Sequence, residues 1–290
     1  MEQSISSLTL AETKPTGSTK NDQVQLTDSP TGIKDLLTLL TTPITPQPTL
    51  YIDLEGINLS RHGPIFLIQI WQTPLNRAFI IDVHTLGAQA FEVANDKGTT
   101  LRSVLEDKTV RKYLFDCRND SDALFAHYGV KLAGVTDLQL LELATRQPGR
   151  RSRVSGLAHY VEEVLLRRQA SSPSPAAAAE VEDFKITKSA VHRLFDPRFG
   201  SSCEVFNVRP LPRVLVEYAV GDVRYLPLLA AAFEEKLNRV WMKRAGVESG
   251  RRLRQSWGLA MRRIVLTRVW ARGVGGSCLR VGVSRLLVWG

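Results

Sequence analysis

Apolar residues in the middle of the chain occur first in short runs and then at helical spacings. The short runs are rich in branched and aromatic residues, as buried strands are, and lie at residues 50–56, 65–71, 78–83 and 112–115. Short turns join the first three, which predicts an antiparallel meander, because a parallel connection needs about a dozen residues. Helical spacing is found at residues 100–105, 121–128, 138–145, 156–166 and 212–237. The pattern predicts an α/β domain: a mixed sheet with antiparallel first three strands, flanked by helices.

The two ends of the chain differ from this central region. Residues 1–48 are polar and then Pro-rich, which predicts a disordered N-terminal region and linker with one short helix at residues 33–40. The folded domain is expected over residues 49–240, with a low-complexity surface insertion at about residues 169–182. Residues 241–290 are then expected to form a basic C-terminal tail.

The charge of the chain is concentrated in that tail. Residues 257–290 contain six Arg, no Lys and no acid, so subtracting six from the total of +9 leaves +3 on residues 1–256. A positive chain suggests a polyanionic partner such as nucleic acid. The tail itself has two interpretations, a basic nucleic-acid-binding segment or sequence that is not native coding sequence, and the second is slightly favoured.

Cysteine content and hydropathy indicate the cellular compartment in which the protein is expected. Cys117, Cys203 and Cys278 are odd in number and widely spaced, which argues against a disulfide framework and a structural zinc site. No stretch reaches the length of about 18 apolar residues that spans a bilayer, and no secretory signal begins the chain. We therefore expect an intracellular protein of the nucleus or cytoplasm, with no membrane partner.

The first predicted strand carries two acids. Asp53 and Glu55 are two residues apart, so their side chains would project from the same face while Ile52 and Leu54 face the opposite layer. Two like charges so close favour a bound cation, and a divalent metal with oxygen ligands is the usual one. The alternative interpretation is an edge strand with solvated acids.

Two later segments could complete an acidic site. Asp120 begins a predicted helix, where an acid is also a common capping residue. Asp116 and Asp122 are reserve candidates for the same position. Tyr218 and Asp222 are four residues apart in an apolar helix, so they would share one of its faces.

In order and spacing, these motifs resemble those of the DEDD superfamily of 3′–5′ exonucleases. The resemblance covers roughly residues 49–240 and is strongest to the tyrosine subclass, in the ribonuclease D-like and Egalitarian-like branch with its ribonuclease H-like fold. It rests on the Asp-x-Glu strand, the following strand at residues 66–70, the acid at a helix start, and the Tyr-x-x-x-Asp helix preceded by Arg209 and Pro210. Asp137 matches a recurrent position in the family that we interpret as structural.

The resemblance implies a mechanism and a set of roles. Two Mg²⁺ or Mn²⁺ ions, about 4 Å apart, would be bound by four acids while Tyr218 positions the attacking hydroxide. The four acids are Asp53, Glu55, Asp120 and Asp222. The implied function is hydrolysis of phosphodiester bonds from a single-stranded 3′ end, with RNA favoured over DNA and nucleoside 5′-monophosphates as products. Protein partners are not specified.

Two further expectations concern binding. Five arginines are available for backbone phosphates, although loop arginines are more often simply solvated: Arg118, Arg146, Arg150, Arg151 and Arg153. The alternative to an enzyme is a catalytically silent RNA-binding adaptor that keeps the fold. Because all four acids and the tyrosine are present, catalysis is favoured.

Overall fold

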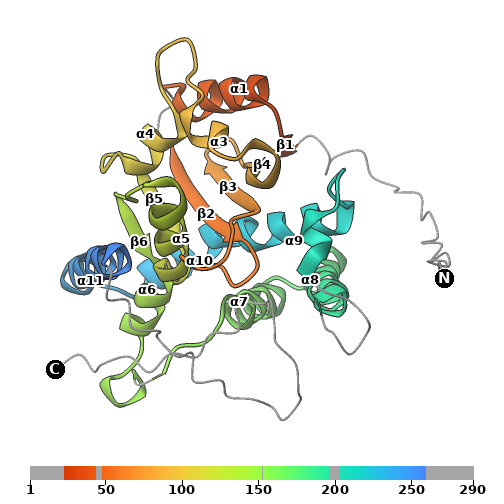
Figure 1. Ribbon diagram of the computed structural model, residues 1–290. Coiled ribbons are helices and arrows are strands. Elements are labelled where there is room, and N and C mark those ends of the chain that lie inside the picture. Colours follow the sequence, from red (N-terminus) through yellow and green to blue (C-terminus); the bar gives the residue numbers. More distant parts are fainter. Residues whose placement is uncertain (1–22, 44–47, 152, 196–202, 259–290) are drawn as a thin grey trace.

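The protein is built on a mixed sheet of six strands, seen near the centre of Figure 1. The computed structural model describes residues 23–43, 48–151, 153–195 and 203–258. The strands are β1 (Val24–Thr27), β2 (Thr49–Glu55), β3 (Leu67–Thr73), β4 (Arg77–Asp82), β5 (Arg111–Leu114) and β6 (Val135–Asp137). Their order is β1-β4-β3-β2-β5-β6, with β2, β3 and β4 antiparallel and the other pairs parallel. The predicted α/β class, mixed sheet and antiparallel meander are therefore confirmed.

Helices cover both faces of the sheet, and each face has its own apolar core. On one face lie α1 (Pro30–Thr41), α2 (Val83–Leu86), α3 (Gln89–Glu92), α4 (Leu101–Glu106) and α5 (Arg118–Tyr128). The other face is covered by α6 (Leu138–Thr145), α7 (Leu157–Ser171), α8 (Pro175–Phe195), α9 (Arg213–Arg224) and α10 (Leu226–Glu234). The last helix, α11 (Arg239–Trp257), packs beside α5, α6 and β6. None of the described helices combines the length and low polarity needed to cross a bilayer.

Side-chain alternation in β2 decides which layer receives its acids. Leu50, Ile52 and Leu54 are buried in the core beneath α1 to α5. Tyr51 lies in the opposite core, so the odd-numbered positions face the layer that contains α9 and α10. Asp53 and Glu55 therefore point toward these two helices.

The N-terminal region departs from the expectation of disorder. Strand β1 pairs in parallel with β4, and α1 buries Ile33, Leu36 and Leu37 against the sheet. The short helix predicted at residues 33–40 is confirmed, and Ser29 caps it by accepting a hydrogen bond from the Gly32 amide. The sequence pattern does not predict strand β1, because its four residues are stabilised by pairing with β4, more than fifty positions away. The disorder expected of residues 1–22 lies outside the described part of the chain.

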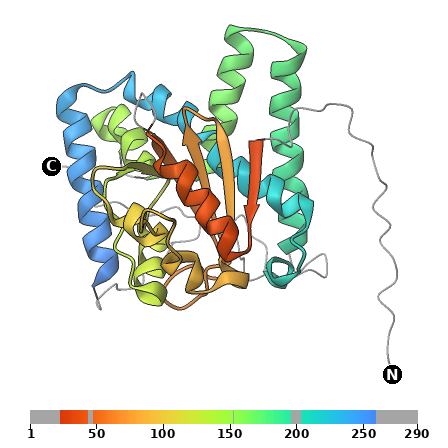
Figure 2. The ribbon, with the colours of Figure 1, turned by 90° about the horizontal axis from the view of Figure 1, so that it is seen from above.

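The low-complexity segment is also more ordered than expected. Residues 169–182 end α7 and begin α8, and the two helices form the antiparallel pair that stands to one side in Figure 2. A run of alanines has high helix propensity, and α8 then buries Val181, Phe184 and Val191. The segment is thus helical, and most of residues 169–182 lie on the surface as expected; that it is an insertion stays a prediction.

The helical stretch predicted at residues 212–237 is divided, because Pro227 occupies the first turn of a new helix, α10.

The predicted basic tail is wrong for residues 241–257, which belong to α11. That helix buries Ala245, Ser249, Arg252 and Leu253 at helical spacing. Two of these four side chains are polar, so hydropathy alone does not indicate a buried face. The expectation for residues 259–290 lies outside the described residues.

Candidate active site

The site is built where β2 ends beneath α9. Asp53 and Glu55 lie at the carboxyl end of strand β2, and Asp222 lies on α9, about 170 positions later in the chain. One carboxylate oxygen from each lies within 4.8 Å of the others. We call Asp53, Glu55 and Asp222 the carboxylate cluster. The two β2 acids are therefore not simply solvated edge-strand residues.

Tyr218 lies on the same face of α9 as Asp222, one turn earlier, as the spacing predicts. Burial raises the pKa of the Tyr218 phenol well above its usual value, and the charges of the carboxylate cluster raise it further. The phenol is therefore protonated at neutral pH and able to donate a hydrogen bond.

The chemistry of these groups fits a divalent cation. Carboxylate oxygens are the ligands that Mg²⁺ and Mn²⁺ prefer, and three acids so close repel one another without a positive charge between them.

Gln69 adds a second observation, because it lies directly opposite Asp53 on β3 and faces the same layer. Among the described residues, neither polar atom of its buried amide has a hydrogen-bond partner. A polar group buried in this way is expected to serve a bound water or ligand.

A lysine that sequence analysis missed also reaches the cluster. Lys188, on α8, forms an ion pair with Asp222, and its ammonium lies 4.0 Å from the centre of the Tyr218 ring. Neither spacing nor a recognised motif singles out this residue, which lies outside the motifs that carry the resemblance. Only the packing of α8 against α9 brings its charge to the site.

The second-motif acid, Asp120, lies in the first turn of α5 and is completely buried. It is not one of the three residues whose oxygens lie within 4.8 Å of one another. The reserve candidates have other roles in the structure. Asp116 forms an ion pair with Arg118, and Asp122 forms one with Arg61. Asp120 therefore stays the prediction for the fourth ligand.

Asp137 determines where α5 begins. Its carboxylate accepts hydrogen bonds from the backbone amides of Asp116 and Cys117, the two residues before the helix. It also caps α6 through the Gln139 amide. Asp116 has a φ of 62°, an unusual value for a residue with a side chain, which these bonds maintain. The buried Asp137 thus acts as a structural residue, in agreement with its interpretation from sequence.

The start of α9 is anchored to the far end of the meander. Arg209 binds the buried Asp82 at the end of β4 with two guanidinium nitrogens. Burial acts to raise the pKa of Asp82, but hydrogen bonds from Arg209 and Thr85 outweigh it and hold that pKa below its usual value. This pair fixes the segment that leads into the helix carrying Tyr218 and Asp222.

The arginines proposed to hold phosphates fall into two groups. Arg146 binds Glu142, Arg118 binds Asp116, and Arg151 stacks on Trp241 at 4.1 Å. The remaining two, Arg150 and Arg153, are not buried. Three of the five are therefore engaged within the protein.

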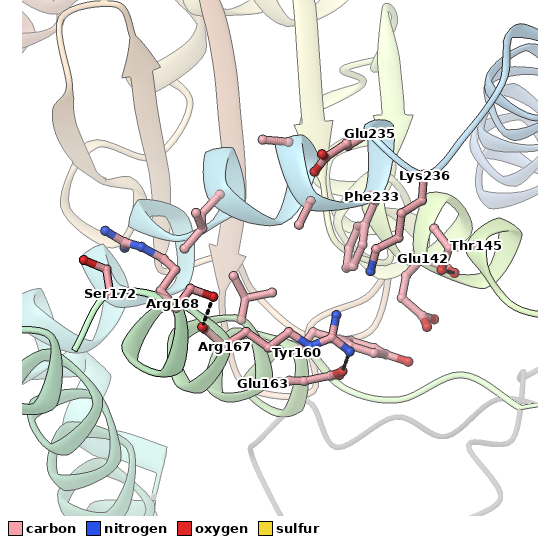
Figure 3. A pocket seen from close by; sticks show the side chains of 15 residues that line it. Glu142, Thr145, Tyr160, Glu163, Arg167, Arg168, Ser172, Phe233, Glu235 and Lys236 are labelled. Carbon is pink, nitrogen blue, oxygen red and sulfur yellow. Dashed lines mark hydrogen bonds and ion pairs between the residues drawn. The ribbon is translucent and has the colours of Figure 1, made fainter.

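A separate cavity of about 540 Å³ lies between α6, α7 and α10 (Figure 3). Its apolar wall includes Leu228 and Phe233, and the side chains of Arg167, Arg168 and Lys236 are found at its edge. Acidic residues lie beside these cations, among them Glu163, which pairs with Arg167. The cavity includes no residue of the carboxylate cluster and presents no one-sided positive charge.

Fold and site together define a class of protein. A mixed sheet of this topology, with clustered acids on a central strand and a covering helix, is the ribonuclease H-like arrangement of ribonuclease D-type DEDD exonucleases. The chain belongs to the 3′–5′ exonuclease family, whose model matches residues 33–238. The family assignment made from the sequence motifs is thus confirmed.

Individual relatives support this assignment. The piRNA biogenesis protein EXD1 of Mus musculus is 26% identical over 196 residues, which are 67% of this chain and 31% of that protein. The chain therefore spans about a third of the length of that relative. Ribonuclease D of Trypanosoma brucei, in its complex with GMP, has 24% identity and a TM-score of 0.59 over 81% of this chain and 64% of its own. Its complex with the RNA U12 has the same identity and TM-score and is covered over 70%.

Proposed function

We propose that this protein is a divalent-metal-dependent exonuclease that removes nucleotides from the 3′ end of RNA and releases nucleoside 5′-monophosphates. The observation that carries the proposal is the convergence of Asp53 and Glu55 with Asp222, together with a protonated Tyr218 beside them. Membership of the 3′–5′ exonuclease family supports the direction of attack. The RNA and GMP bound by the trypanosomal ribonuclease D support the substrate and the product class.

The carboxylate cluster and Asp120 would hold the metal ions. Bound divalent ions would supply an activated water and stabilise the charge that develops on the departing 3′ oxygen. Tyr218 would orient the attacking water by hydrogen bonding, because its raised pKa keeps the phenol proton in place. The buried position of Tyr218 and Asp222 keeps this geometry fixed as the chain end enters.

The first test compares RNA and DNA oligonucleotides of one sequence, labelled at the 5′ end and incubated with Mg²⁺. We expect ladders that shorten from the 3′ end, faster on RNA, with 5′-monophosphates identified by chromatography. The Asp53→Ala protein should give no ladder, whereas Glu217→Ala, an exposed change on α9, should behave as wild type. Cleavage that persists in Asp53→Ala would reject the proposal.

One observation favours the alternative of a silent RNA-binding adaptor. The ion pair between Lys188 and Asp222 already places a positive charge beside one acid of the cluster. Such a protein would bind the same oligonucleotides without shortening them at any Mg²⁺ or Mn²⁺ concentration.

A further inference from the structure

Helix α11 lies beyond the residues that match the family model, which end at 238. It nevertheless packs against α5, the helix that carries Asp120, on the side of the molecule opposite the α7–α8 pair (Figure 2). Polar contacts join α11 to the two residues that directly follow Asp120: Ser121 contacts α11 directly, and Asp122 is linked to it through Arg61.

Ser121 is held by the last turn of α11. Its hydroxyl lies 2.7 Å from that of Ser256 and accepts a hydrogen bond of 3.1 Å from the indole nitrogen of Trp257. Ser121 and Ser256 are both completely buried. A buried hydroxyl without a hydrogen-bond partner carries a desolvation penalty. These hydrogen bonds therefore favour one position of α11 relative to α5.

Asp122 is held by a residue from the loop that follows β2. The backbone amide of Arg61 donates to Asp122 at 2.7 Å, and its guanidinium donates at 2.9 and 2.6 Å. The same guanidinium donates to the carbonyls of Ser256 and Gly258 at 3.0 and 2.8 Å. These carbonyls end α11 and lack helical partners, so a cation is favourable there. Arg61 thus joins the loop after the Asp53 strand to α5 and α11.

One turn earlier, α11 also reaches the residues that precede α5. Arg252 forms a buried ion pair of 2.6 Å with Asp137. Asp137 in turn binds the backbone amides of Asp116 and Cys117. Helix α5 is therefore held to α11 both before its first turn and directly after Asp120.

We infer that α11 positions Asp120 for metal binding, and that Ser256 and Trp257 are positioning residues of the active site. The inference rests on the proposed function, in which Asp120 is the fourth metal ligand. Mg²⁺ demands near-ideal ligand geometry, so a shift of α5 would be transmitted directly to the site. Residues that orient metal ligands from outside commonly change metal affinity by about 10- to 100-fold when they are replaced.

The test measures Mn²⁺ binding to the purified chain by isothermal titration calorimetry, alongside thermal unfolding. Trp257→Phe removes the indole donor but keeps an aromatic ring, and Ser256→Ala removes the hydroxyl. Each should bind Mn²⁺ about tenfold more weakly than wild type while remaining folded. Val247→Ala is the matched control, because Val247 lies on the same helix with 64% of its surface exposed. It should bind Mn²⁺ as wild type does.

Mn²⁺ affinities of Trp257→Phe and Ser256→Ala within twofold of wild type would overturn the inference, even if both variants unfold at lower temperature. Should Ser256→Ala fail to fold, Trp257→Phe alone decides. A wild-type protein that binds Mn²⁺ but leaves oligonucleotides intact would reject the proposed function instead. The positioning role would still be judged from the affinities, so the two failures are distinguishable.

Discussion

Tyr218 is the residue whose chemistry depends most on its neighbours. A phenol on a helix usually packs in a core, and Tyr218 is indeed buried, yet its oxygen shares its surroundings with three carboxylates. Each of these negative charges opposes loss of the phenol proton, so the group remains a hydrogen-bond donor well above neutral pH. The spacing of Tyr218 and Asp222 is readable from sequence, but the raised pKa depends on the two acids of β2.

We expect Tyr218→Phe to lower turnover by about 100-fold at saturating Mg²⁺, because it removes the donor that orients the attacking water. Mn²⁺ affinity should change little, since Phe keeps the ring and no carboxylate is lost. Steady-state rates on labelled RNA and calorimetric Mn²⁺ titration measure the two quantities. Turnover within threefold of wild type would contradict the role assigned to the phenol.

Gln69 offers a prediction in which stability and activity change in opposite directions. Its amide is fully buried on the β3 side of Asp53, without a hydrogen-bond partner among the described residues. Gln69→Met keeps the volume and removes the desolvated polar atoms, so unfolding should cost about 1–2 kcal/mol more. Turnover should fall, because the variant lacks the amide that we expect to bind a water or ligand at the site. Chemical denaturation and RNA hydrolysis measure the two effects, and a less stable variant would show that the amide is satisfied in solution.

At the scale of elements, the site depends on how α9 is held over β2. The helix carries two site residues and packs against β2, β3 and β4, while the Arg209–Asp82 pair fixes the segment before it. The apolar face of α9 predicts a core helix, but the segment that leads into it is held by an ion pair that joins residues 127 positions apart.

That ion pair predicts a pH-dependent stability. The pKa of Asp82 is lower in the folded protein than in the unfolded chain, so its contribution is present at pH values above the unfolded pKa of about 3.9. The contribution is lost as pH falls through the folded-state pKa. Asp82→Asn should therefore destabilise the protein by about 2 kcal/mol at pH 7. The difference from wild type should shrink below about pH 4, as measured by urea unfolding at several pH values. A difference that is constant with pH would contradict the ion pair.

For the molecule as a whole, the carboxylate cluster is a local source of instability that a bound divalent cation would relieve. Three negative charges within 4.8 Å repel one another, and Lys188 offsets only part of that repulsion. Any ligand that binds only the folded state raises the free energy of unfolding, by about 2.7 kcal/mol at a hundredfold excess over the dissociation constant.

We therefore expect Mn²⁺ to raise the melting temperature of the protein and EDTA to reverse the change. Glu55→Gln should melt at a higher temperature than wild type in EDTA, because one repelling charge is gone. It should also gain less from Mn²⁺, because one ligand is gone. The exposed Glu217→Gln serves as control and should follow wild type in both conditions. Differential scanning calorimetry measures these shifts, and an equal response of Glu55→Gln and wild type to Mn²⁺ would contradict the site.

The amino-acid sequence by itself determined the local parts: the strand with Asp53 and Glu55 on one face, the helix with Tyr218 and Asp222 on one face, and the α/β class. These follow from periodicities of two and about 3.6 residues, which involve only near neighbours. Tertiary structure alone decided the remainder, including the place of β1, the packing of α8 that brings Lys188 to Asp222, and the buried polar bonds of α11. Such contacts join segments far apart in sequence and use polar side chains, so neither hydropathy nor spacing could predict them.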